Sequence, residues 1–62
     1  MIKLKKPELL FIEDNDIIIV NDVRYIVNSI YYDQHGYVTE INATNVDVAP
    51  SYDLSGFIDE EQ

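Results

Sequence analysis

Two turn signals divide residues 16–44 into three runs that are rich in β-branched and aromatic side chains. The first signal is Asn21-Asp22, and both residue types tolerate the positive φ angles of a two-residue hairpin loop. Apolar runs flank this pair on both sides, so the loop is expected to place Val20 opposite Val23. The region therefore predicts a β-hairpin at its start.

The second signal joins the second run to the third. It reads Asp33-Gln34-His35-Gly36, with aspartate at the first position and glycine at the fourth. This pattern is typical of a type I turn closed by a glycine bulge, and it would set Tyr32 opposite Val38. Three consecutive strands joined by two tight turns are therefore expected.

These pairings assign side chains to faces, because side chains alternate along a strand and a slip of one residue exchanges the two faces. One face is apolar, whereas the other mixes isoleucines, Tyr32 and Val38 with Arg24, Asn28, Glu40 and Asn42. The apolar face is the predicted core, and it carries Ile18, Val20, Val23, Tyr25, Val27, Tyr31, Tyr37, Ile41 and Ala43.

The long run from Val23 to Tyr32 is apolar on both sides. Such a strand fits a sheet that bends sharply, as in small barrels. Residues 1–6 also alternate, and they predict either an edge strand that ends at Pro7, with Ile2 and Leu4 inward, or a frayed end. We therefore predict an all-β fold, a small bent sheet or barrel of about five strands with short irregular ends.

The run DIIIVNDVRYIVNSIYYDQHGYVTEI, residues 16–41, resembles the central strands of SH3-like small barrels. A short strand, a tight turn, a long bent strand, a glycine turn and a third strand follow in the same order. The resemblance implies a barrel of a kind that hosts RNA binding, peptide binding and assembly roles in phage and bacterial complexes. The first turn lacks glycine and the chain has no tryptophan, which argues against a groove for proline-rich peptides.

At 62 residues the chain is expected to form one small β domain in residues 1–50, followed by an acidic and aromatic tail in residues 51–62. Residues 46–48 would add one brief strand before the tail. Two interpretations of the tail remain open. Its aromatic residues fold back to close one end of the core, or the tail becomes ordered on a partner.

The net charge of -8 is unevenly distributed along the chain. Lys3, Lys5 and Lys6 supply three of the four basic residues, so from Pro7 onward only Arg24 opposes twelve carboxylates, a net charge of -11. A body this acidic repels a polyphosphate. No direct nucleic-acid partner is therefore expected, and weak binding through the lysines and tyrosines is kept as a minor alternative.

Catalytic and metal-binding chemistry is not expected. The chain has no cysteine, its one histidine, His35, lies in a predicted turn, and no serine has the context of a nucleophile elbow. Residues 13–16 are acidic but lack the spacing of a calcium loop. We therefore predict no enzyme activity, no cofactor and no metal.

No membrane partner is expected either. No apolar run approaches the roughly 20 residues that span a bilayer. The start of the chain also lacks the apolar core of a signal peptide. We therefore expect a complete, cytoplasmic chain.

Two protein-binding functions remain. Carboxylates that repeat along a rigid sheet can imitate a nucleic-acid backbone, so the leading prediction is an acidic inhibitor that binds the basic surface of a nucleic-acid-handling host or defence protein. The alternative is a structural adaptor that packs against another subunit or a second copy. The length and acidity also resemble small inhibitor proteins of phages and mobile elements. The candidate partner-binding residues are Asp16, Asp22, Asp33, Glu40, Asp47, Tyr31, Tyr32, Tyr52, Phe57, Asp59, Glu60 and Glu61, supported by Glu13, Asp14 and Asp53.

Overall fold

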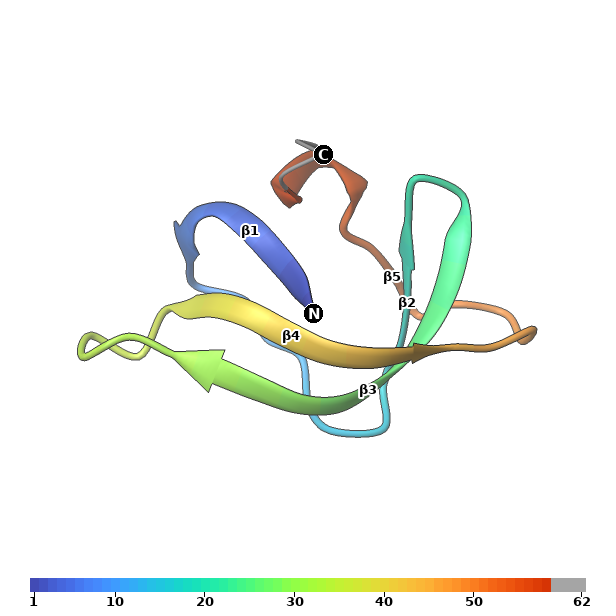
Figure 1. The fold of residues 1–62 in the computed structure, drawn as a ribbon, viewed down its shortest axis with the longest axis horizontal. Helices are drawn as coiled ribbons and strands as arrows, with labels where there is room; N and C mark the ends of the chain where they lie inside the picture. Colours follow the sequence, from blue (N-terminus) through green and yellow to red (C-terminus); the bar gives the residue numbers. More distant parts are fainter. Residues whose placement is uncertain (59–62) are drawn as a thin grey trace.

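The computed structural model describes residues 1–58 and has the predicted all-β architecture, one five-stranded sheet curled into a half-barrel (Figure 1). The strand order across the sheet is β1-β4-β3-β2-β5. Among the described residues there is no helix of the length and hydropathy needed to cross a membrane. The elements are β1 (Ile2–Glu8), β2 (Ile17–Val20), β3 (Val23–Tyr32), β4 (Val38–Asn45), β5 (Tyr52–Asp53) and the 3₁₀ helix η1 (Ser55–Phe57).

The β2–β3 turn has the predicted geometry. Asn21 and Asp22 have φ angles of 51° and 70°, and Val20 pairs with Val23. Positive φ at both loop residues matches the twist of the flanking strands. The Asn21 N–H also donates a hydrogen bond to Ser55 Oγ at 2.9 Å, so the turn is held by the C-terminal segment as well as by its own strands.

The β3–β4 turn also confirms its prediction, because Tyr32 pairs with Val38. The Gly36 N–H donates to the Asp33 carbonyl at 3.0 Å, and the Asp33 N–H donates to the Tyr37 carbonyl at 2.9 Å. Gly36 has a φ of 83°, a conformation that glycine adopts more readily than any residue with a Cβ. Local chemistry at the two turns therefore sets the pairing beside each of them.

A bulge within β3 changes the faces that strict alternation predicts. The pairing with β4 shifts register between Val27 and Ser29, so that Asn28 is an extra residue on β3. An extra residue reverses the alternation beyond it, and Ile30 rather than Tyr31 packs against the core. The placement of Tyr31 in the core was therefore wrong, and its side chain is 44% exposed.

A second register shift lies between Tyr31 and Tyr32, where Thr39 is the extra residue on β4. It brings Val38, which was expected on the mixed face, into the core with no exposed surface. Val23 and Tyr37 were expected in the core but are exposed. Both lie beside a turn at an end of the sheet, beyond the packed side chains.

β1 is the predicted edge strand, with Leu4 buried and Ile2 packed against the core. It continues through Pro7 to Glu8, so the prediction that Pro7 ends the strand was wrong. The register of β1 against β4 shifts between Lys3 and Glu8. An edge strand tolerates proline because one side of its backbone has no ladder to complete.

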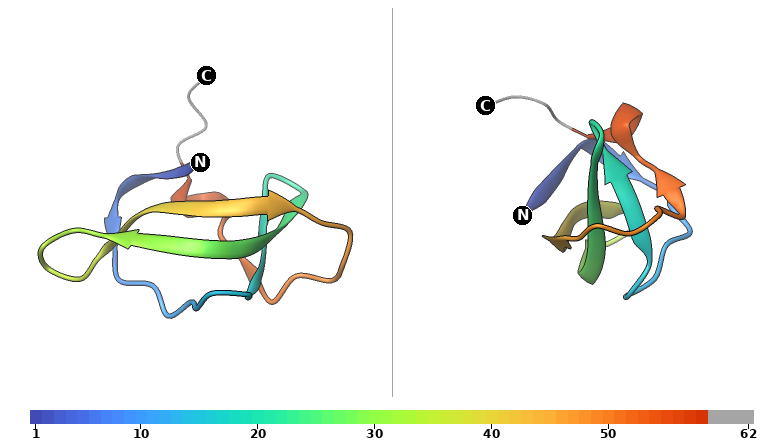
Figure 2. Two further views of the ribbon diagram at one scale, coloured as in Figure 1. Left: turned by 60° about the horizontal axis from the view of Figure 1, so that its bottom comes forward. Right: turned by 90° about the vertical axis from the view of Figure 1, so that its right-hand side faces the viewer.

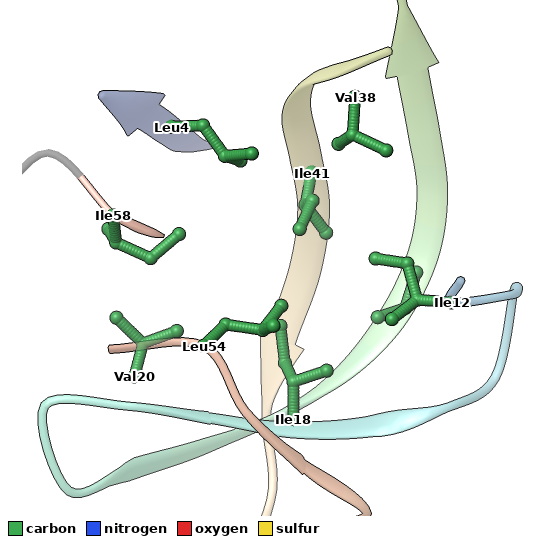
Figure 3. Close-up of a cluster of buried hydrophobic side chains, with 9 residues drawn as sticks. Leu4, Ile12, Ile18, Val20, Val38, Ile41, Leu54 and Ile58 are labelled. Atoms are coloured by element: carbon green, nitrogen blue, oxygen red, sulfur yellow. The ribbon is translucent and has the colours of Figure 1, made fainter. Parts of the chain in front are cut away.

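Segments far apart in sequence close the half-barrel around its core (Figure 3). β1 pairs antiparallel with β4, and β5 runs parallel to β2. The chain after β5 then reaches β1, where Leu4 and Ile58 form an isolated bridge. Aliphatic burial is the main stabilising contribution in so small a fold. The buried residues are Leu4, Ile12, Ile18, Val20, Val27, Val38, Ile41, Leu54 and Ile58.

Residues 52–58 therefore contribute to the core, through Leu54 and Ile58. Tyr52 and Phe57 stay exposed. The closing side chains of this segment are thus aliphatic, whereas the first interpretation of the tail expected aromatic ones. Leu54 lies beside β2, where its N–H donates to the Ile19 carbonyl, and Ile58 lies beside β1, where it bridges to Leu4.

The connection between β4 and β5, residues 46–51, passes over the outer side of the β2–β3 hairpin (Figure 2). It is anchored at both ends, since the Val46 N–H donates to the Arg24 carbonyl at 2.9 Å and the Ser51 N–H donates to the Ile17 carbonyl at 2.7 Å. Residues 46–48 are not a strand, contrary to the prediction. These residues are part of the connection that crosses from β4 to β5, and they form no strand of the sheet.

Candidate functional site

Residues 1–58 enclose no pocket, and they hold no group of three or more His, Cys, Asp or Glu side chains that could bind a metal. The predicted partner-binding residues within this range lie on strands, in the connections between strands and, for Phe57, in η1. Asp59, Glu60 and Glu61 lie outside the described residues, so their assignment stays a prediction. A binding site in residues 1–58 would therefore consist of surface side chains that the fold brings together.

The predicted carboxylates do not form one row along a strand. Asp22 lies in the β2–β3 turn and Asp33 in the β3–β4 turn, at opposite ends of the ten-residue strand β3. A strand of that length spans about 33 Å when straight, which is several Debye lengths at physiological salt. Asp47 lies in the β4–β5 connection. The expected continuous ladder of carboxylates is thus replaced by charges dispersed over two turns and the β4–β5 connection.

Asp33 holds its own turn together. Its Oδ1 accepts hydrogen bonds from the N–H groups of His35 at 2.8 Å and Tyr37 at 3.0 Å. The Tyr37 N–H is the main reason why the pKa of Asp33 lies below its ordinary value, although partial desolvation opposes this shift. Lysine at this position would remove the acceptor of both hydrogen bonds. Asp33 therefore stabilises the turn, whether or not it also contacts a partner.

Asp53 and Asp16 have similar local roles. Asp53 Oδ1 accepts from the Ser55 hydroxyl at 2.7 Å and from the Ser55 N–H at 3.0 Å, and the hydroxyl is the main cause of a lowered pKa of Asp53. Asp16 Oδ2 accepts from the Glu13 N–H at 2.8 Å. Asp16 thus fixes the connection that precedes β2, and Asp53 fixes the chain that follows β5. Glu13 and Asp14 are exposed.

Tyr31 and Glu40 lie side by side on the outer surface of the sheet. Tyr31 on β3 pairs with Glu40 on β4, and Glu40 pairs in turn with Lys3 on β1. Tyr37 is also exposed, at the turn of the same hairpin directly before β4, with its ring centroid 6.2 Å from that of His35. Both members of the predicted pair, Tyr31 and Tyr32, are exposed.

Exposed apolar side chains in the β1–β2 connection, residues 9–16, were missed by the sequence reasoning. Leu9 is 60% exposed and Phe11 is 80% exposed, whereas Leu10 packs against the core and Ile12 is buried. The available signal was the run Leu9–Ile12 directly before the acidic residues 13–16. Four consecutive apolar residues do not reveal which two face the solvent.

Comparison with protein-family models, curated proteins and solved structures gave no match.

Proposed function

We propose that the protein is a non-catalytic binding module for a larger protein with a basic surface. The observation that carries this proposal is the display of its acidic charge, because no charged side chain among residues 1–58 is buried. The carboxylates of Asp16, Asp33 and Asp53 accept from backbone N–H groups or from Ser55 rather than from lysine or arginine. Charge displayed in this way accelerates association with a cationic surface and loses effect as salt increases.

Inhibition of a host or defence protein that handles nucleic acid is the narrower form of this proposal. The curled five-stranded sheet is compatible with an SH3-like barrel, a type of scaffold that serves binding roles. Carboxylates spread over several turns support electrostatic steering toward a basic groove more than a close imitation of phosphate spacing. The inhibitor therefore competes with nucleic acid by occupying the groove, without reproducing the helical backbone.

A structural adaptor is the second candidate, and the exposed aromatic residues of the β3–β4 hairpin favour it. Tyr31, Tyr32 and Tyr37 are each more than 40% exposed, and tyrosine combines a large apolar surface with a polar tip. Such residues are enriched in the cores of protein interfaces. An adaptor interface would be less sensitive to salt than an inhibitor that binds through charge.

The test is capture of partners from the native cell on the immobilised chain, with elution by stepwise increases in salt. Glu13, Asp14 and Asp47 are exposed, so the triple variant to lysine keeps the turn-forming aspartates. The matched control replaces the same residues with Gln, Asn and Asn. We expect a salt-eluted partner that the lysine variant loses and that added DNA displaces. A partner retained at high salt by both variants would instead support the adaptor.

A further inference from the structure

We propose that the β1–β2 connection, residues 9–16, is the docking element for an extended segment of a partner protein that carries both basic and apolar side chains. This inference rests on the proposed function and adds the surface and the chemistry of the partner. Three independent features of the connection lead to it. They are its side-chain alternation, its backbone and its charge.

The side chains of residues 9–12 alternate as those of a strand do. Leu10 and Ile12 point into the core and anchor the segment, whereas Leu9 and Phe11 point outward. Phe11 is the most exposed large hydrophobic side chain among the described residues. Two outward apolar side chains on an anchored segment mark an interaction surface more strongly than single exposed residues scattered over a protein.

The backbone of the same residues lies outside the sheet. Within residues 1–58, the backbone hydrogen bonds between this connection and a strand lie at its C-terminal end. There the Asn15 N–H donates to the Val27 carbonyl at 2.7 Å, and the Val27 N–H donates to the Asp16 carbonyl at 2.8 Å. An extended segment of another protein can pair with a backbone that is presented in this way, while its side chains meet Leu9 and Phe11.

The charge of the connection selects the partner. Glu8 precedes the two apolar side chains in the sequence and Glu13, Asp14 and Asp16 follow them, and residues 8–16 contain no lysine or arginine. A basic segment complements this surface. A second copy of the chain brings the same carboxylates and a net charge of -8, so like charges oppose self-association through this face.

The experiment titrates the isotope-labelled full chain with a synthetic peptide of alternating lysine and valine and follows backbone amide NMR shifts. Peptides of alternating glutamate and valine, and of lysine and serine, are the controls for charge and for apolar contact. We expect shift changes concentrated in residues 9–16. Phe11→Ser should weaken binding about tenfold or more, and Val48→Ser, at a 50% exposed position in the β4–β5 connection, should not. Unfolding curves should show both variants as stable as the parent.

Several results would overturn the docking element. They are shifts centred on other residues, equal binding of the glutamate peptide, an unchanged affinity of Phe11→Ser, and self-association that Phe11→Ser abolishes. Binding of the lysine and valine peptide at another acidic surface, such as that around Asp47, would reject this site and leave the proposed function standing. No binding of that peptide, together with salt-insensitive capture of partners, would reject both.

Discussion

Leu54→Ala tests whether the C-terminal segment is part of the folding unit. Leu54 lies directly after β5 and is only 4% exposed. Its N–H donates to the Ile19 carbonyl at 2.9 Å, so the side chain is held over the core by the backbone. Truncation to alanine removes buried methyl groups and leaves a cavity that the surrounding strands fill only in part.

The expected loss is a large share of the total stability. Replacing a buried leucine with alanine costs about 2 to 5 kcal/mol, whereas a domain of 62 residues has a total unfolding free energy of about 3 to 9 kcal/mol at the usual value per residue. With a urea dependence of about 1 kcal/mol per M for so small a protein, the midpoint should fall by about 2 M or more. Val48→Ala, at a half-exposed position, should cost less than about 1 kcal/mol.

The assay is urea unfolding followed by far-UV circular dichroism and by tyrosine fluorescence, whose curves should coincide for a two-state domain. A chain shortened to residues 1–50, which lacks Leu54 and Ile58, should remain unfolded without urea. Equal midpoints for Leu54→Ala and Val48→Ala, or a folded chain of residues 1–50, would show that the segment lies against the sheet without supporting it.

Three further predictions concern the turns and the faces of the sheet. Gly36→Ala should cost about 1 kcal/mol because Gly36 has a positive φ, while Gly56→Ala, with open space at its Cβ, should be nearly neutral in the same urea assay. The lowered pKa of Asp33 means that its ionised form contributes stability above its unfolded pKa, and this contribution is lost as pH falls through the folded value. An acid titration of Asp33→Asn should therefore show a smaller loss of stability below about pH 4; an unchanged acid profile would contradict the role given to the carboxylate. Ile18→Asp should unfold the domain because it buries an unpaired charge, whereas Tyr31→Asp should leave a folded circular dichroism spectrum.

The candidate site could be predicted only in part. Asp22, Asp33 and Asp47 were expected at the surface and are there, but their dispersal depends on where each turn falls in the curled sheet. Phe11 and Leu9 were not anticipated, because the outward direction of a side chain in an irregular segment depends on which neighbours reach the core. Leu9 and Phe11 face outward because Leu10 and Ile12 pack into the core, and strands distant in the sequence form that core.

The sequence by itself determined the two tight turns, the pairing beside each of them and the all-β class. Asn21-Asp22 and Asp33 to Gly36 act through φ preferences and hydrogen bonds within a few residues, so these features are readable locally. Only the tertiary structure decided the bulges at Asn28 and Thr39, the closure by Leu54 and Ile58 and the exposure of Phe11. Each of these results from packing between residues far apart in the chain, where a single extra residue on one strand exchanges the faces of all that follow.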